Sequence, residues 1–410
     1  MTRGGSAGTG PAGSGPAGGG PARNDRVWQA GFLVGSALGV AATVVGRRME
    51  RSARRGLVDW PAAERIAAGR LRRAPGALDP AELAATEPAY AATMTRIVPR
   101  LSEALGAELP GVVARAGVVD RAGWVRANST GFAALIGRLE GELLDQIVPP
   151  GGGIGQAGVA LANRWVTTRQ IGLLLGFMGA RVLGQYDLAL LSAETTPGRL
   201  LFVEENIRQT ARSLGVPLDD FRTWIALHET THAFEFEAHP WLRPYLADRL
   251  ERQLTAFSSS SRRIAPDLIG RLARSLRRDP EAGHWMERLM SDEQRRLFRE
   301  TQAVMSLLEG FSDYIMDEVG RDLVPDVERI SARFHARREQ RKSGFDRAIM
   351  RITGMDMKLE QYKKGERFVR TIAERGGPAA LERLWSGPEA LPRDGEIEAP
   401  ERWLARVMAA

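Results

Sequence analysis

The chain has 410 residues, 43% hydrophobic and 26% charged, enough for a sizeable core in one large or two smaller domains. It contains no cysteine, which excludes disulfides, cysteine-ligated metal sites and a cysteine nucleophile. Most of the net charge of +7 comes from residues 1–56, where eight arginines face two acids, so the remainder carries only +1. A general nucleic-acid-binding surface has little support, and we expect no nucleic-acid partner.

The amino-terminal region divides into a polar tail and an apolar run. Residues 1–26 are rich in glycine, proline and alanine and are predicted to be disordered. Residues 27–46 contain no charge, and five arginines follow by residue 55. As a helix the run would span about 30 Å, the thickness of a bilayer core.

Two interpretations of residues 27–46 stay open. Positive charge after the run argues against a cleavable signal peptide and favours a membrane anchor whose following domain stays on the cytoplasmic side. The run is only moderately apolar, however, so a helix packed against the rest of the protein is an equal alternative. We therefore expect a cytoplasmic protein, anchored to the inner face of the cell membrane if the first interpretation holds.

Residues 57–148 are predicted to form a helical subdomain, with amphipathic helices over 80–105 and 120–144. Two prolines and three glycines at 149–153 mark its end, and a catalytic region is expected over 149–405. Gly153, Gly155 and Gly158 match the spacing of a dinucleotide-binding loop. Because prolines precede them and no acid follows about twenty residues on, we interpret them as a loop entering a helix.

Later segments complete a mainly helical picture. Residues 171–180 predict a short buried helix, residues 199–203 a strand that could pair edge to edge with an extended peptide, and residues 206–214 a helix. The helix after these is expected to be capped by Asp219 or Asp220. Further helices are predicted over 301–319, 324–342, 344–375 and 379–385, with the basic run 333–342 as a solvated face. The fold class expected is mainly α, an α+β fold with a small sheet.

The most informative motif is His228-Glu229-Thr230-Thr231-His232. Histidines four apart project from one helix face, one turn from each other. Both can reach about 2.1 Å from one zinc ion. Glu229 can then sit beside a zinc-bound water and act as general base, as a metallohydrolase requires. The alternative, a pair of buried histidines with hydrogen-bond partners, leaves the acid between them unexplained.

A zinc hydrolase site needs a third protein ligand and an open fourth position. His239 lies seven residues after His232 instead of the six of an extended motif. It would be about 10 Å away along a helix, so we reject it. Glu235 shares the histidine face but lies a turn beyond, and it is the weaker candidate. Glu309 is the better one, because Glu309 and Asp313 face inward together from an apolar helix.

The role expected for Asp313 is to accept the outer N–H of a metal-bound histidine, while Glu309 binds the metal itself. The alternative is that these two acids form an inward salt bridge with an arginine. A group that stabilises the oxyanion is also expected in a peptidase. Tyr314, Tyr186 and His335 are candidates, although each fits a structural role better.

Further short motifs accompany the histidine pair. They are Val58-Asp59-Trp60, Gly184-Gln185-Tyr186-Asp187, Leu201-Phe202-Val203, Asn206-Ile207, Asp219-Asp220-Phe221-Arg222, Trp224, Pro240-Trp241-Leu242-Arg243, Glu309-Gly310, Asp313, Lys358-Leu359, Gln361-Tyr362 and Leu384-Trp385. Together they resemble the zincin-like metallopeptidase family of actinobacteria and their relatives. Its members are often labelled provisionally as hydrolases or as proteins associated with deazaflavin-coenzyme biosynthesis.

The resemblance runs from about residue 57 to the carboxyl end. It implies a zincin-like fold, with His228, His232 and Glu309 as zinc ligands and Glu229 as general base. The chain departs from the family pattern at Phe311 and Tyr314, where histidines are common, and at His239, where a small apolar residue is usual. These differences affect the surroundings of the site and leave the ligand set intact.

The function expected is a zinc-dependent metallohydrolase, a peptidase in the first instance, with a peptide or small amide as substrate. One alternative is a non-catalytic regulatory or binding protein in which zinc stabilises the fold. Another is a hydrolase of small amides or esters in coenzyme metabolism. The sequence indicates neither the substrate nor the oligomeric state.

Overall fold

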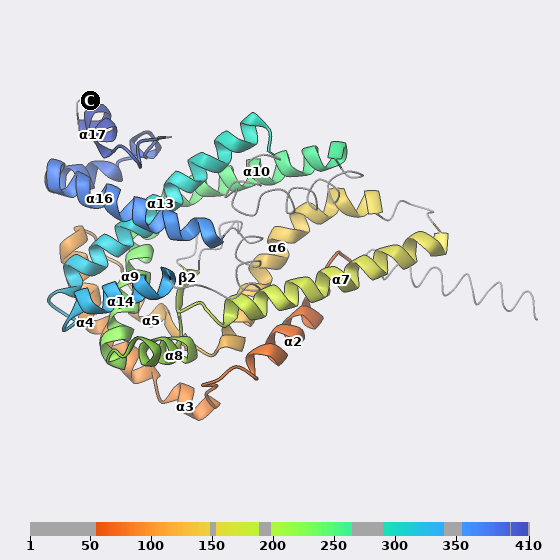
Figure 1. Cartoon of the computed structure of the whole chain (residues 1–410), viewed down its shortest axis with the longest axis horizontal. Helices are drawn as coiled ribbons and strands as arrows, with labels where there is room; N and C mark the ends of the chain where they lie inside the picture. The colour runs from red at the N-terminus through yellow and green to blue at the C-terminus, as the bar shows by residue number, and fades with distance from the viewer. Residues whose placement is uncertain are drawn as a thin grey trace, which may run out of the picture.

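The protein is described here from a computed structural model (Figure 1). It describes residues 55–147, 153–187, 198–264, 290–339, 355–393 and 395–408. The predicted tail at 1–26 and the apolar run at 27–46 lie outside these ranges. Within them, no helix combines the length and the hydrophobicity that crossing a bilayer would require.

Helices make up most of the described chain. They are α2 (Trp60–Leu71), α3 (Pro80–Ala84), α4 (Glu87–Leu105), α5 (Val112–Arg115), α6 (Arg121–Ile147), α7 (Gly153–Gly179), α8 (Glu204–Leu214), α9 (Leu218–Glu237), α10 (Leu242–Ile264), α13 (Asp292–Gly320), α14 (Val327–Glu339), α16 (Met355–Leu384) and α17 (Pro400–Met408), with a short 3₁₀ turn at Pro388–Ala390. The strands are β1 (Ala116–Val119), β2 (Gly184–Asp187) and β3 (Arg199–Val203). A mainly α fold with a small sheet is thereby confirmed.

The sheet has the order β1-β3-β2. The central strand β3 has the predicted bounds and pairs in parallel with β1 and antiparallel with β2. The prediction that Leu201 to Val203 could pair with a peptide is therefore wrong, because both sides of β3 are already hydrogen-bonded. Among the described residues, β2 is an edge strand with one strand partner, and the sequence did not predict it.

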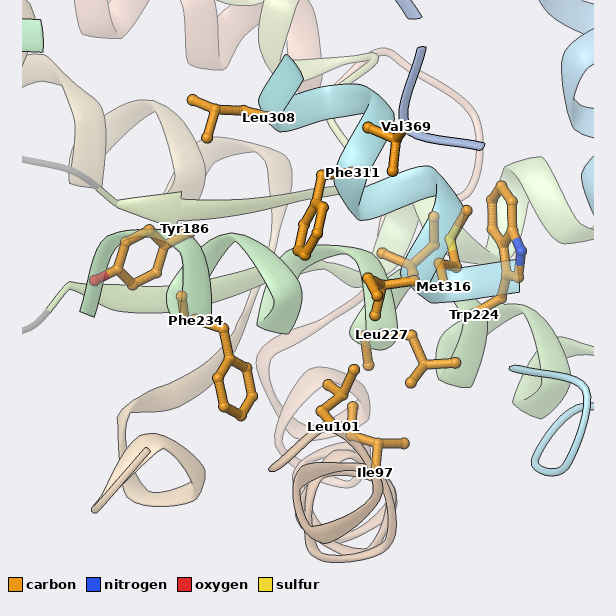
Figure 2. Close-up of a cluster of buried hydrophobic side chains, with 14 of the residues drawn as sticks. Ile97, Leu101, Tyr186, Trp224, Leu227, Phe234, Leu308, Phe311, Met316 and Val369 are labelled. Carbon is orange, nitrogen blue, oxygen red and sulfur yellow. The ribbon is translucent and has the colours of Figure 1, made fainter. Parts of the chain in front are cut away.

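Helix α9 lies at the centre of the molecule. Ile97 and Leu101 of α4 pack on one side of it, and Phe311 and Met316 of α13 lie on the other, as Figure 2 shows. Its own buried residues run almost without interruption from Phe221 to Phe236. This burial on several sides holds the helix rigidly, so side chains that it carries have fixed positions.

Helices α13 and α16 cross with their backbones in contact at two glycines. A Cβ built on Gly310 would lie 2.0 Å from the carbonyl carbon of Gly365, and one built on Gly365 would lie 1.8 Å from the carbonyl oxygen of Ser306. Since Cβ atoms do not approach that closely, only glycine permits this crossing. Glu309 precedes Gly310 in the sequence, and α13 packs against α9 as well as against α16.

Several predicted helix boundaries are corrected by the structure. The helix expected over 80–105 is split into α3 and α4 around Thr86. Asp219 and Asp220 lie in the first turn of α9 and do not cap it, because the helix begins after Pro217. Helix α13 starts earlier than predicted, at a capping box formed by Ser291 and Gln294.

The predictions for the glycine motif, the segment 171–180 and the basic run are only partly confirmed. The glycine motif at 153–158 forms the start of the long helix α7, which ends at Gly179 and so includes all but the last residue of the predicted segment 171–180. That segment is only partly buried, since Leu175 and Phe177 are covered whereas Leu173 is 40% exposed. In the basic run, exposed Arg333 donates to the carbonyls of Leu214 and Gly215 at the end of α8, so it is more than a solvated side chain.

The division at residue 149 stays a prediction. Residues on both sides of it contribute to one hydrophobic core, in which Met94 and Ile97 of α4 lie with Phe202 of β3 and Trp224 of α9. A smaller cluster joins α2, α6 and α7 around Trp124 and Leu175.

Candidate metal centre

His228 and His232 project from the face of α9 that turns toward α13. Their Nε2 atoms lie 3.6 Å and 3.8 Å from the same carboxylate oxygen, Oε2 of Glu309. The two imidazole rings are 4.7 Å apart between centroids and nearly perpendicular. Helical spacing on α9 supplies the pair, and the packing of α13 against α9 brings Glu309 to them.

The three side chains fit a divalent metal ion. Their ligand atoms all lie within 4.8 Å of one another. Four ligands at zinc–ligand distances of about 2.1 Å are separated by roughly 3.4 Å in a tetrahedron, which is close to the spacing seen here. Two imidazole nitrogens with one carboxylate oxygen are also a donor set that zinc accepts.

Each histidine is also held from behind through its Nδ1 atom. Asp313 Oδ1 lies 3.3 Å from Nδ1 of His228. Glu235 Oε2 lies 2.8 Å from Nδ1 of His232, and the hydroxyl of Ser312 donates to the other oxygen of Glu235. Carboxylates placed this way orient an imidazole so that Nε2 points at the metal.

The electrostatic surroundings favour positive charge at this place. Burial lowers the pKa of His228, but the carboxylates of Asp313 and Glu309 outweigh it and hold that pKa well above its ordinary value. Burial also lowers the pKa of His232, but the carboxylate of Glu235 outweighs this effect, so that the pKa is raised overall. A divalent cation would take the place of these protons, because metal ligands must be deprotonated.

Glu229 follows His228 on α9 and lies against Gly184 of β2. It is 8% exposed, and its charge raises the pKa of His228. A Cβ on Gly184 would lie 2.6 Å from Cγ and 2.8 Å from Oε1 of Glu229. The glycine at the start of β2 thus leaves the space that the Glu229 side chain fills.

Four side chains considered from sequence are not members of the group formed by His228, His232 and Glu309. His239 stacks on Trp385 and bonds to the Glu235 carbonyl, in keeping with its rejection as a ligand. The Tyr186 hydroxyl donates to Glu237. Tyr314 lies near Arg370, and His335 lies near Asp313 and Glu366.

The structure corrects the role considered for Glu235. It approaches Nδ1 of His232, on the opposite side of the ring from Glu309, so it supports the histidine and does not join the three ligand atoms. Ser312 and Gly184 were not singled out from sequence as site residues. Ser312 could have been found by its position three residues after Glu309 on the same helix face, whereas no local pattern marks Gly184.

The sequence model of a family described as zincin-like metallopeptidase matches residues 58–404. The chain belongs to this family. Zincin-like proteins are metal-dependent hydrolases as a class, and the His228, His232 and Glu309 group agrees with that assignment.

A solved structure supports the same assignment. It is a protein of Chloroflexus aurantiacus, titled provisionally as a hydrolase with a novel fold. The zincin-like chain is 34% identical to it, with a TM-score of 0.63 over 86% of this chain and 99% of that one. No curated protein matches the chain.

Proposed function

We propose that the protein is a zinc-dependent peptidase in which His228, His232 and Glu309 hold the metal and Glu229 is the general base. The observation that carries this is the number of ligands. Among the described residues, the group that contains both histidines offers three ligand atoms and no fourth. Three protein ligands with one position left for solvent or substrate are typical of catalytic zinc, whereas structural zinc has four.

The partial exposure of the site supports the same reading. The side chains of His228 and His232 are 13% and 15% exposed, so solvent reaches them. When bound, zinc supplies Lewis-acid activation of water and of a carbonyl group. Glu229 takes the proton of the attacking water and passes it to the leaving amine. Burial of Glu229 keeps competing water away from its carboxylate.

A peptide substrate is favoured by the edge of the sheet. The hydrogen bond from Val203 N–H to the Leu183 carbonyl marks that pair as a hydrogen-bonded one. Bonding alternates along an antiparallel ladder, so the backbone groups of Gly184 and Tyr186 face away from β3. Within the described chain no strand pairs with that side of β2.

An extended peptide added to β2 as a further strand would pass beside Glu229, which lies against Gly184. Main-chain hydrogen bonds of this kind bind peptides with little regard to side chain. They would contribute little to the binding of a single-residue amide or ester. Such compounds are the substrates expected if the protein is instead a hydrolase of small amides or esters.

Glu229→Gln is the direct test. It should retain stoichiometric zinc, because Glu229 is not a ligand, and lose hydrolysis of a peptide library by a factor of about 10² or more. Glu382→Gln, which removes an exposed carboxylate from α16, is the matched control. Purified protein without stoichiometric zinc, or undiminished hydrolysis by the Glu229 variant, would refute the proposal.

Chain length of the substrate separates the two hydrolase proposals. We expect kcat/KM to rise steeply from single-residue amides to peptides long enough to pair with β2. Equal rates on both would instead favour the small-amide hydrolase.

A further inference from the structure

A second group of metal-binding side chains lies on the far side of His228. Asp313 on α13, His335 on α14 and Glu366 on α16 place one ligand atom each within 4.8 Å of one another. Asp313 is almost fully buried, and the other two are half-buried. The three helices are brought together by packing, because the residues lie far apart in the sequence.

We propose that this group binds a second divalent transition-metal ion. The carboxylate of Asp313 faces two ways. Its Oδ1 lies 3.3 Å from Nδ1 of His228. The residue is only 4% exposed. Its Oδ2 atom is buried and has no hydrogen-bond partner among the described residues. A buried carboxylate oxygen without a donor is costly, and a cation would satisfy it.

The charge balance around the group points the same way. Asp317, one turn beyond Asp313 on α13, also has a buried oxygen with no hydrogen-bond partner in the described chain. The guanidinium of Arg370 lies 3.0 Å from Glu366 and 3.8 Å from Asp317. The carboxylates outnumber the guanidinium that contacts them, and a divalent ion would offset the excess negative charge.

The donor types indicate which ions would bind. One imidazole with two carboxylates suits zinc or manganese, whereas calcium and magnesium prefer oxygen ligands throughout. The group is also held firmly in place. Glu366 follows Gly365 at the crossing of α13 with α16, so this crossing brings the ligand to Asp313 of α13. Asp313 would then connect the two ions through His228.

Zinc stoichiometry tests the proposal without any measurement of activity. The full chain is stripped with a chelator, loaded with Zn²⁺, passed over a desalting column and analysed for metal by mass spectrometry. We expect two zinc ions per wild-type chain and one in His335→Ala and in Glu366→Gln, each checked for folding by circular dichroism. The control Glu382→Gln, in the part of α16 after the kink at Gly377, should keep two.

The double variant His228→Ala/His232→Ala separates this proposal from the catalytic one, and it should keep one ion. A single wild-type ion that this double variant loses would overturn the second site and leave the peptidase proposal standing. If the wild type instead holds a single ion that the double variant keeps and Glu366→Gln loses, the second site is supported and the catalytic site is removed. Two ions retained in both His335→Ala and Glu366→Gln would overturn the second site outright.

Discussion

The glycine crossing of α13 and α16 gives the sharpest prediction about stability. In Gly310→Ala, the new Cβ would lie 2.0 Å from the Gly365 carbonyl carbon and 2.3 Å from the Glu366 nitrogen. Both are backbone atoms that cannot rotate aside. An ordinary contact begins at 3.4 Å, so the helices must separate by about 1.4 Å at this point, which loosens the packing of Phe311 against its neighbours.

Separation of packed helices by this amount should lower the free energy of unfolding by about 3 kcal/mol or more. This is at or above the upper end of the range of destabilisation that overpacked cores show. The gain in helix propensity on replacing glycine by alanine returns no more than about 1 kcal/mol. Gly131 in α6 is the matched control, because a Cβ there meets nothing within 4 Å. Gly131→Ala should therefore be neutral or stabilising by about 0.5–1 kcal/mol.

Urea denaturation followed by tryptophan fluorescence measures both variants. Their midpoints should move in opposite directions, and Gly310→Ala should also bind zinc more weakly because Glu309 moves with α13. Wild-type stability of Gly310→Ala would show that the helices do not cross as described. An equal loss in Gly131→Ala would show that glycine content, and not the crossing, determines the effect.

Two further predictions concern the metal centre, and a third concerns Asp317. Gly184→Ala places a methyl group 2.6 Å from Cγ of Glu229, and we expect this flexible side chain to be displaced. Peptide hydrolysis should therefore fall at least tenfold, while zinc content and thermal stability change little. An unchanged kcat would contradict this prediction. Glu235→Ala removes the carboxylate behind His232 and should weaken zinc binding 10–100-fold; competition with a chromogenic chelator measures this, and unaltered affinity would count against an orienting role.

Burial, followed by neighbouring carboxylates, raises the pKa of Asp317 to about 7 from 3.8. In chelator the folded state therefore holds a proton that the unfolded state releases, and stability should fall as pH rises from about 4 to 7. Asp317→Asn should flatten that slope and increase the free energy of unfolding at pH 7 by up to about 4 kcal/mol, because about 3 pKa units correspond to 1.36 kcal/mol each. Urea denaturation across this pH range measures the slope, and an unchanged slope would refute the prediction.

Local sequence was enough for much of the site. A histidine pair four apart predicts one shared helix face, and the apolar surroundings of Glu309 and Asp313 predict that both point inward. The structure brings Glu309 to both Nε2 atoms and Asp313 to Nδ1 of His228. Their roles toward zinc remain proposals until metal is measured. The central strand was predicted because its five residues are almost all large and apolar.

The remaining features depend on segments far apart in the sequence. Strands β1 and β2 have four residues each, too few for a periodic signal, and they exist because β3 pairs with both. The space that Gly184 leaves for Glu229 and the meeting of His335 with Glu366 both follow from how helices and strands pack. Side-chain periodicity determines which face of a helix is buried. What that face meets is decided only when the helices cross, here at two glycines that bring their backbones into contact.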